Sequence, residues 1–324
     1  MKAIVCTALT GLDGLELQDV PTPEPGPGQV RVRVHAAGIN FADTLIIKGR
    51  YQVRPEPPFT PGLEAAGEVV ACGPGVSWQV GARVAVLCDY GAFAEEVVVA
   101  AERLVPLPDA MDYVTAAGFL VAWGTSHIAL RHRGGLKAGE TLLVHGAAGG
   151  VGLTAVAIGK RLGATVIATA GDDEKLALVR EHGADHTINY RTGGFRDTVR
   201  ELTGGRGADV IYDPVGGDVF DESLRCINWE GRLLVIGFAS GRVPEAPANL
   251  LLVKNCSAIG VYWGAYAMKD PKVLVDSLAE LFRWYAEGSI RPHTSMTFPL
   301  EQATDALRAL KERRSTGKVV LTVR

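Results

Sequence analysis

The chain has 324 residues, of which 47% are hydrophobic and 21% are charged, and its formal net charge is −3. This length predicts two domains with buried cores, and the small negative charge without a basic block argues against a nucleic-acid partner. No run of about 18 apolar residues predicts a membrane span, and the strand-like start, Met1-Lys-Ala-Ile-Val, lacks the apolar core of a signal peptide.

The cysteines are odd in number and lie far apart in the sequence. They are Cys6, Cys72, Cys88, Cys226 and Cys256. They form no C-x-x-C pair, and none has the spacing to a histidine that zinc sites use. We therefore expect reduced thiols in a cytoplasmic protein.

Residues 1–117 are predicted to be rich in β-structure and to form a compact, barrel-like unit. In residues 29–36, Val30, Val32 and Val34 alternate with polar residues, which is typical of a strand with one buried face. The proline-rich residues 21–28 are interpreted as a surface loop rather than a polyproline recognition segment. The expected strands are 2–6, 29–36, 67–72, 83–87 and 93–99.

From Thr141 onward, short apolar runs alternate with segments of helical periodicity, after one or two helices in residues 112–130. Strands separated by helices predict a parallel sheet with right-handed crossovers. The expected strands are 141–145, 165–169, 186–188, 209–212, 232–236 and 257–262, and the expected helices are 150–162, 173–182, 195–202 and 217–228.

A glycine-rich turn joins the first of these strands to its helix, in the sequence Val144-His-Gly-Ala-Ala-Gly-Gly-Val-Gly152. Read as the G-x-G-x-x-G fingerprint, it has Ala147, Gly149 and Gly152 at the three glycine positions. Small residues let the backbone turn sharply and approach a pyrophosphate, and the helix N-terminus offers free N–H groups to it. The turn therefore predicts a dinucleotide-binding unit, with Ala147, Ala148, Gly149, Gly150 and Val151 as cofactor-binding residues.

The C-terminal segment departs from the strand–helix alternation. Residues 271–288 are predicted to form an amphipathic helix, a second helix is expected to end at Arg313, and residues 316–323 are predicted to form a closing strand. Because this segment is too short for a domain of its own, we expect it to return to the N-terminal unit.

These features together resemble the zinc-independent quinone oxidoreductases (zeta-crystallin-like) of the medium-chain dehydrogenase/reductase superfamily. The resemblance spans the chain and includes Ala37-Gly-Ile-Asn-Phe-Ala-Asp43, Pro61-Gly-Leu-Glu-Ala-Ala-Gly67, residues 183–190, Asp213-Pro-Val-Gly-Gly217 and Thr316-Gly-Lys-Val-Val-Leu321. It implies an α/β fold in which a doubly wound Rossmann domain, residues 118–264, accompanies a discontinuous GroES-like β-barrel domain, residues 1–117 and 265–324.

The resemblance also indicates whether a zinc site is expected. Zinc-dependent alcohol dehydrogenases of the superfamily have cysteine where this chain has Asn40, and histidine where it has Leu63. Leucine has no lone pair for a metal, so no metal site is expected. Without a metal, hydride delivery to a quinone or an α,β-unsaturated carbonyl is the favoured reaction, because the conjugated acceptor spreads the developing charge.

The resemblance favours NADPH as the cofactor. The position that holds an acidic ribose ligand in NAD enzymes falls at Ala170, and Lys175 and Tyr190 match residues that contact the 2′-phosphate in the resembling enzymes. Asp172 conflicts with a phosphate unless it points away or caps the next helix. Further cofactor-binding candidates are Gly171, Phe238, Tyr262, Trp263 and Lys318. The three aromatic residues follow predicted strands at the carboxyl edge of the sheet, where ligands bind, with core packing as the alternative for each.

Three residues are candidates for the chemistry itself: Asn40, Tyr51 and Thr125. The Asn40 amide is expected to bond the cofactor ribose or the substrate oxygen, with loop capping as the alternative. Tyr51 either donates its phenolic proton or lines the pocket, and Thr125 either touches the nicotinamide end or packs within a helix. His145 is interpreted as structural.

Two other functions stay open: an enoyl-thioester reductase, and an NADPH-binding protein with little turnover. The apolar strand 257–262 predicts an unprotected sheet edge, and related proteins pair such strands across a two-fold axis. We therefore expect a homodimer formed through the Rossmann edge strands.

Overall fold

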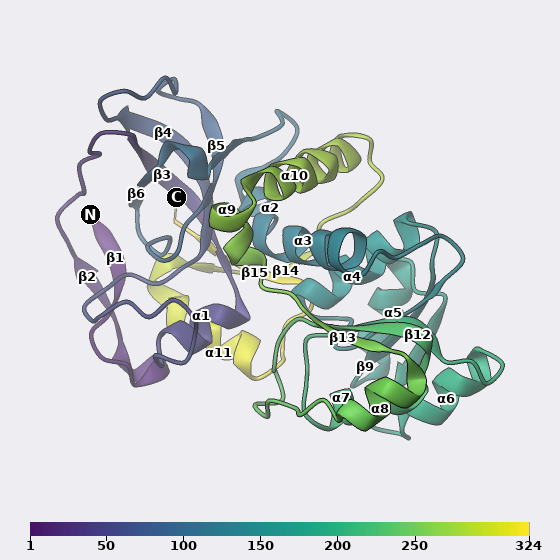
Figure 1. The fold of residues 1–324 in the computed structure, drawn as a ribbon. Coiled ribbons are helices and arrows are strands. Elements are labelled where there is room, and N and C mark those ends of the chain that lie inside the picture. Colours follow the sequence, from purple (N-terminus) through teal and green to yellow (C-terminus); the bar gives the residue numbers. More distant parts are fainter. Residues whose placement is uncertain (324) are drawn as a thin grey trace. The chain divides into compact units, whose positions relative to one another are not determined.

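A computed structural model describes residues 1–323. Within it the chain forms two compact units, one of residues Met1–Val121 together with the C-terminal segment from Pro292, the other of residues Ala122–Arg291 (Figure 1). No helix among the described residues is long and apolar enough to cross a membrane.

The first unit is built on a seven-stranded sheet in which β3 (Gln29–Ile39) is central. Its path runs β14-β15-β3-β4-β5-β7, with β6 also pairing with β3, and β1 and β2 form a separate antiparallel ribbon. The other strands are β1 (Lys2–Cys6), β2 (Leu15–Asp19), β4 (Glu64–Cys72), β5 (Arg83–Leu87), β6 (Glu96–Ala100), β7 (Leu104–Pro106), β14 (Thr294–Pro299) and β15 (Lys318–Thr322). The helices of this unit are α1 (Phe41–Ile46), α2 (Tyr113–Ala117) and α11 (Ala303–Lys311).

The alternating valines of β3 form the centre of this unit's core, as the period of two predicts. Val30, Val32 and Val34 are fully buried and pack with residues of β4, β5 and β15. β15 runs antiparallel to β3, with Val319 opposite Ile39. The C-terminal segment therefore returns to the N-terminal sheet, as expected from the sequence.

The second unit contains a six-stranded parallel sheet with the order β10-β9-β8-β11-β12-β13. Its strands are β8 (Thr141–Val144), β9 (Thr165–Ala170), β10 (His186–Asn189), β11 (Ala208–Asp213), β12 (Ile227–Val235) and β13 (Ser257–Gly260). Its helices are α3 (Leu120–His127, beginning two residues before the unit), α4 (Gly150–Arg161), α5 (Asp173–Glu181), α6 (Phe195–Leu202), α7 (Asp218–Cys226), α8 (Ala248–Lys254), α9 (Tyr266–Lys269) and α10 (Pro271–Ala286).

Helices cover both faces of the parallel sheet, which is the doubly wound arrangement expected from the sequence. In Figure 1, α3, α4 and α5 lie on one side of the sheet and α7 and α8 on the other. Side chains of α6 and α7, with Phe220 and Leu224 among the most buried, form one core with the inner face of the strands. Burial on both faces explains why β8 and β9 contain apolar runs without alternation.

Helix α10 belongs to the second unit, whereas residues 265–324 were predicted to belong to the GroES-like domain. It packs on the π-helical turn Ile128–Arg133 that follows α3, and the buried His127 ring contacts it. His127 Nδ1 lies 2.8 Å from Ser277 Oγ, and Nε2 lies 3.1 Å from Glu280 Oε2. These contacts join residues about 150 apart in sequence, which helical periodicity alone does not reveal.

Several short elements were not predicted, and the starts of several strands differ from the prediction, with β4 beginning at Glu64 instead of residue 67 and β6 at Glu96 instead of residue 93. Helices α1 and α8 and strand β14 have only six, seven and six residues, too few for a clear period. β12 begins at Ile227 instead of residue 232, because a register shift interrupts its pairing with β11. Glu230 has a φ of 56° within this interruption.

Candidate active site

The glycine-rich turn lies at the carboxyl end of β8, where parallel sheets bind nucleotides. Gly146 has a φ of 56°, and a Cβ placed on Gly152 would lie 2.2 Å from the Gly146 carbonyl oxygen. Ala147 and Ala148 are buried, Gly149 is exposed, and Gly150 and Val151 are half-buried in the first turn of α4. The N–H groups of such a first turn have no partner within the helix, so they are available to an anion.

His145 supports this turn from the inside of the fold. Its Nδ1 lies 3.1 Å from Thr169 Oγ1, its Nε2 lies 2.8 Å from Ser223 Oγ, and its ring meets Phe195 edge-on. Burial lowers the pKa of His145 to about 3, so the ring is neutral at physiological pH. Its position agrees with the structural role expected for it.

A cluster of three hydroxyl groups fixes the other side of the first turn of α4. Ser126 Oγ donates to the Val151 carbonyl oxygen at 2.8 Å, and it lies 2.8 Å from both Thr154 Oγ1 and Tyr212 Oη. Burial raises the pKa of Tyr212, so the phenol keeps its proton for this cluster. Sequence patterns do not reveal this cluster, because its members come from α3, α4 and β11.

The ends of β9 and β10 bring cationic and phenolic groups around Gly171. A Cβ placed on Gly171 would lie 2.8 Å from Tyr190 Oη and 3.3 Å from Arg191 Nε. Lys175 lies in the first turn of α5, half-buried, and its Nζ is 3.5 Å from Asp172 Oδ2. Arg191 was not among the predicted site residues, although it directly follows Tyr190 in the sequence.

Asp172 caps helix α5. Its Oδ1 accepts a hydrogen bond from the backbone N–H of Lys175 at 2.9 Å. A carboxylate at a helix N-terminus is stabilised by the helix dipole, and one of its oxygens is already engaged. This was one of the two arrangements under which the sequence analysis reconciled Asp172 with a nearby phosphate.

The loop that follows β11 is held by its own hydrogen bonds, and the loop that follows β12 packs on it. Asp213 Oδ1 accepts from the N–H groups of Val215 and Gly216 at 2.8 and 2.9 Å. A Cβ placed on Gly216 would lie 3.0 Å from Phe238 Cδ1, so glycine is required for the second loop to pack on the first. Phe238 stays 36% exposed at this carboxyl edge of the sheet.

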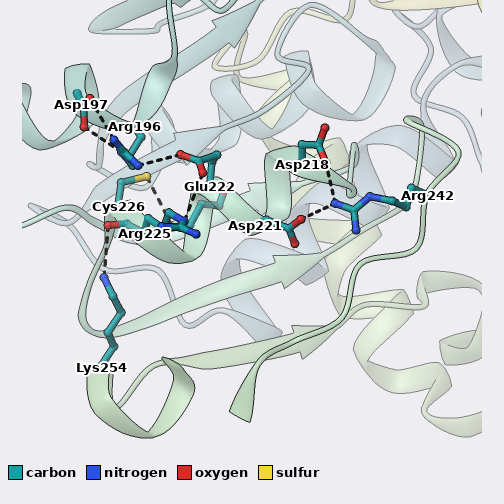
Figure 2. A network of polar contacts seen from close by, with 10 residues as sticks. Arg196, Asp197, Asp218, Asp221, Glu222, Arg225, Cys226, Arg242 and Lys254 are labelled. Atoms are coloured by element: carbon teal, nitrogen blue, oxygen red, sulfur yellow. Dashed lines mark hydrogen bonds and ion pairs between the residues drawn. The ribbon is translucent and has the colours of Figure 1, made fainter. Parts of the chain in front are cut away.

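Arg242, in the loop that follows β12, also binds helix α7, which follows the loop after β11. Figure 2 shows Arg242 reaching Asp218 and Asp221 of α7, with 2.9 Å between its Nη2 and Asp218 Oδ1. On the same helix, Glu222 pairs with Arg196 of α6 at 3.4 Å. These pairs are exposed, so we expect them to position the loop rather than to contribute much stability.

Beyond β13, Tyr262 is 41% exposed and Trp263 is buried. The Trp263 ring lies against Gly124 of α3, since a Cβ placed on that glycine would lie 2.7 Å from the indole Nε1. Thr125 follows in the same helix and is also buried. The predicted Thr125 and Trp263 are therefore near each other within the second unit.

The first unit holds a separate polar cluster around Asn40, at the end of β3. Lys318 Nζ donates to Asn40 Oδ1 at 2.8 Å and to Glu64 Oε1 at 2.9 Å. Asn40 Nδ2 donates to the same Glu64 oxygen at 2.9 Å. Two of the predicted site residues, Asn40 and Lys318, are thus in direct contact, together with Glu64, which was not predicted.

Asp43 lies beside this cluster and is fully buried. Its Oδ2 accepts from the Asn40 backbone N–H at 2.7 Å. Burial raises the pKa of Asp43 to about 7, against the opposing effects of this N–H and of the Lys318 ammonium. Burial likewise raises the pKa of the nearby Cys88 thiol, which is therefore protonated and unreactive.

Comparison with known proteins decides the family. The family model of zinc-binding dehydrogenases matches residues 150–280, and that of the alcohol dehydrogenase GroES-like domain matches residues 26–109. Quinone oxidoreductase-like protein 2 of Rattus norvegicus is 42% identical, over 100% of this chain and 92% of the rat protein. Quinone oxidoreductase of Pseudomonas aeruginosa is 40% identical, over 99% of each chain. The chain belongs to the quinone oxidoreductase family of the medium-chain dehydrogenases/reductases.

Solved structures of the quinone oxidoreductase family agree with this fold along the whole chain. The structure of Escherichia coli quinone oxidoreductase complexed with NADPH has a TM-score of 0.94 at 31% identity and covers 100% of both chains. That of the Pseudomonas syringae enzyme has a TM-score of 0.94 at 34% identity and covers 99% of each chain. The GroES-like and Rossmann-type assignments made from the sequence are therefore confirmed.

In this member of the quinone oxidoreductase family, the remaining predicted residue, Tyr51, follows α1. It is half-buried and packs against the core of the first unit, and its carbonyl oxygen accepts from Arg54 Nε at 2.9 Å. Leu63, at the position of a zinc-ligating histidine, is buried in the same core. Among residues 1–323, no three His, Cys, Asp or Glu side chains gather as a metal site would require.

Proposed function

We propose that this protein is an NADPH-dependent oxidoreductase that delivers hydride to a quinone or an α,β-unsaturated carbonyl, without zinc. The observation that carries the proposal is that Tyr190 and Arg191 lie against Gly171 at the end of β9, with Lys175 in the first turn of the helix that follows. This arrangement occurs in a chain that is similar along its whole length to a quinone oxidoreductase solved with NADPH. We also expect a cytoplasmic location, since all five cysteines are free thiols.

The residues of the second unit fit a dinucleotide. Gly149 at the N-cap of α4, with Gly150 and Gly152 in its first turn, leaves little side-chain cover there, so a pyrophosphate can reach the N–H groups. Gly171 at the end of β9 lets the Tyr190 hydroxyl approach the backbone closely. We assign the pyrophosphate to Ala147, Ala148, Gly149, Gly150 and Val151, and the nicotinamide end to Phe238, Tyr262, Trp263 and Thr125.

The charge at the end of β9 favours a 2′-phosphate over a 2′-hydroxyl. Lys175 and Arg191 supply cationic groups there, and Tyr190 supplies a phenolic hydroxyl. The acid that NAD enzymes use to bind the ribose is replaced by the buried Ala170. Asp172 is committed to the N-terminus of α5, so its charge is partly compensated there.

The bound cofactor supplies the hydride, and the protein orients the partners and stabilises the charge that develops on the acceptor oxygen. For these roles we propose Asn40, Tyr51 and Thr125. The Asn40 amide is held by two charged neighbours, so it presents a fixed dipole and needs no reorientation during the reaction. Tyr51 would donate its phenolic proton to the acceptor oxygen or line its pocket.

The side chains at two positions support the proposed independence of zinc. The Asn40 amide oxygen is occupied by the Lys318 ammonium, and a cation next to it would oppose a metal ion. Leu63 offers only hydrocarbon. We expect activity to survive dialysis against a strong chelator, and a loss of activity that added Zn²⁺ restores would contradict this part of the proposal.

The reaction is tested by following NADPH and NADH oxidation side by side, with 9,10-phenanthrenequinone and with trans-2-hexenal. Fast quinone- or enal-dependent oxidation of NADPH, with NADH at least about tenfold less efficient in kcat/KM, is expected; tenfold corresponds to about 1.4 kcal/mol. A preference for NADH would overturn the assignment of Lys175, Tyr190 and Arg191. Tight NADPH binding without turnover of either acceptor would favour an enoyl-thioester substrate or a non-catalytic role.

We further propose a homodimer that forms through β13. This strand is the last in the parallel sheet, and Leu252, Val253 and Trp229 of the same unit are exposed apolar side chains. A lysine at an edge strand blocks pairing with another chain. We therefore expect wild-type protein to sediment as a dimer and the Ser257→Lys variant as a monomer, with Gln79→Lys as a control that stays dimeric. A monomeric wild type would refute the proposal.

A further inference from the structure

The ammonium group of Lys318 is buried in the first unit, and each of its hydrogens is donated to an acceptor of the protein. Lys318 is 6% exposed. Its Nζ donates to the Ile39 carbonyl oxygen at 2.8 Å, to Asn40 Oδ1 at 2.8 Å and to Glu64 Oε1 at 2.9 Å. An ammonium has three donors, so all of them are used within the protein. In this arrangement Lys318 has none left for a cofactor phosphate.

Glu64 is the counter-charge of Lys318 and is fully buried. Its Oε1 accepts from Lys318 and from Asn40 Nδ2, while its Oε2 accepts from the backbone N–H of Val121 at 3.0 Å, in the first turn of α3. Both carboxylate oxygens are therefore engaged, one with the amide of Asn40 and the other with the helix that carries Thr125.

The two opposite charges determine which way the Asn40 amide points. Its oxygen faces the ammonium, and its nitrogen faces Glu64 and, at 3.4 Å, the Gly38 carbonyl oxygen. A flipped amide would set its NH₂ group against the ammonium and its oxygen against the carboxylate. Both contacts would be repulsive, and they would be poorly screened because the three groups are buried.

Glycines on both sides keep the cluster closely packed. A Cβ placed on Gly38 would lie 2.6 Å from Glu64 Oε1 and 2.2 Å from the Ala117 carbonyl oxygen. One placed on Gly118 would lie 3.1 Å from Lys318 Cγ. The side chains of Glu64 and Lys318 thus have little room to adopt other rotamers.

We propose that Glu64 and Lys318 are positioning residues that hold the Asn40 amide in a single orientation, and that Lys318 acts through Asn40 rather than on the cofactor. The inference rests on the proposed role of Asn40 in the reaction. It replaces direct cofactor contact as the role of Lys318.

The choice of variant follows from the burial of the pair. Removing one partner leaves an uncompensated buried charge, which is strongly destabilising, whereas removing both charges is often tolerated. The double variant Glu64→Gln/Lys318→Met keeps the shapes of both side chains and removes both charges. A matched control is Lys272→Met/Asp276→Asn, which neutralises an exposed ion pair on α10.

We expect the double variant to fold, to keep its KM for NADPH within about threefold, and to lose about tenfold or more in kcat, as does Asn40→Ala. In the Asn40→Ala background the double substitution should change kcat by less than about twofold, because the pair acts through the amide. The surface control should match wild type. A rise of tenfold or more in the KM for NADPH that persists in the Asn40→Ala background would mean that Lys318 contacts the cofactor, and would overturn the inference.

A measurement without cofactor tests the orientation directly. In protein labelled with ¹⁵N at asparagine, the side-chain NH₂ signal of Asn40, identified by its absence in Asn40→Ala, should exchange slowly with water in wild type and rapidly in the double variant. An unchanged exchange rate in the double variant would overturn this inference but leave the proposed role of Asn40 standing. A wild-type kcat in the double variant, with kcat reduced in Asn40→Ala, would do the same. If Asn40→Ala keeps wild-type kcat, the proposed role of Asn40 fails, and the inference that rests on it fails too.

Discussion

His145 Nε2 lies 2.8 Å from Ser223 Oγ, which joins the residue before the glycine-rich turn to helix α7 on one face of the parallel sheet. The ring is 1% exposed and faces Thr169 on its other side. No carboxylate contributes to the pKa of His145, which burial alone lowers. The turn that we assign to the pyrophosphate therefore rests on a histidine that must be neutral.

This histidine should make the protein sensitive to acid. Its pKa of about 3 in the folded state lies below its value of about 6.5 in the unfolded chain, so the unfolded chain binds more protons between these pH values and stability falls as the pH falls. From about pH 6.5 to about pH 4.5, we expect wild type to lose about 2–3 kcal/mol of unfolding free energy relative to His145→Gln. Urea unfolding of both proteins at the two pH values measures this difference, and a constant difference would refute it.

Asp43 should make the stability of the protein depend on pH in the direction opposite to His145. Its pKa of about 7 in the folded state lies above the usual value, so the folded state binds more protons than the unfolded chain between about pH 4 and about pH 7. Wild type should therefore lose stability relative to Asp43→Asn as the pH rises through this window, and the difference should level off above it. Thermal unfolding across the window tests this, and a difference that moves toward wild type with rising pH would contradict it.

Gly152 should not tolerate even a methyl group. Its Cβ would lie 2.2 Å from a backbone carbonyl oxygen, which cannot rotate away as a side chain could. We expect Gly152→Ala to lose about 1–3 kcal/mol of stability and about tenfold or more in NADPH affinity, measured by thermal unfolding and by quenching of protein fluorescence. Gly193→Ala is the control, because a Cβ there meets nothing within 4 Å. Equal stability and equal NADPH affinity of the two variants would contradict the assignment of the pyrophosphate to the glycine-rich turn.

Lys175 and Arg191 should discriminate between the two nicotinamide cofactors. Replacing either by alanine removes a cation near the end of β9, so the KM for NADPH should rise about tenfold while that for NADH changes less than about threefold. Steady-state kinetics with one quinone acceptor measure both values. Lys160→Ala, which removes an exposed ion pair elsewhere in the same unit, serves as the control. Equal rises for both cofactors would show that neither residue binds the 2′-phosphate.

The sequence predicted best those parts of the fold that repeat over many residues. The period-two valines of β3 and the apolar runs of β8 and β9 were placed within a few residues, because burial on one or both faces determines their pattern. The glycine-rich turn was also identifiable, since a backbone that approaches itself this closely excludes side chains. Short elements such as α8 were missed because seven residues contain less than two full helical periods.

What the sequence determined by itself was the order of strands and helices, the turn between β8 and α4, and the absence of an acid at Ala170. These are local properties of periodicity and of residue size. Only the tertiary structure placed Lys318 against Asn40, because the antiparallel pairing of β15 with β3 joins residues 278 apart. The pairing of β3 with β4 brings Glu64 to the same place. Glu64 there supplies the counter-charge that a buried ammonium such as that of Lys318 requires.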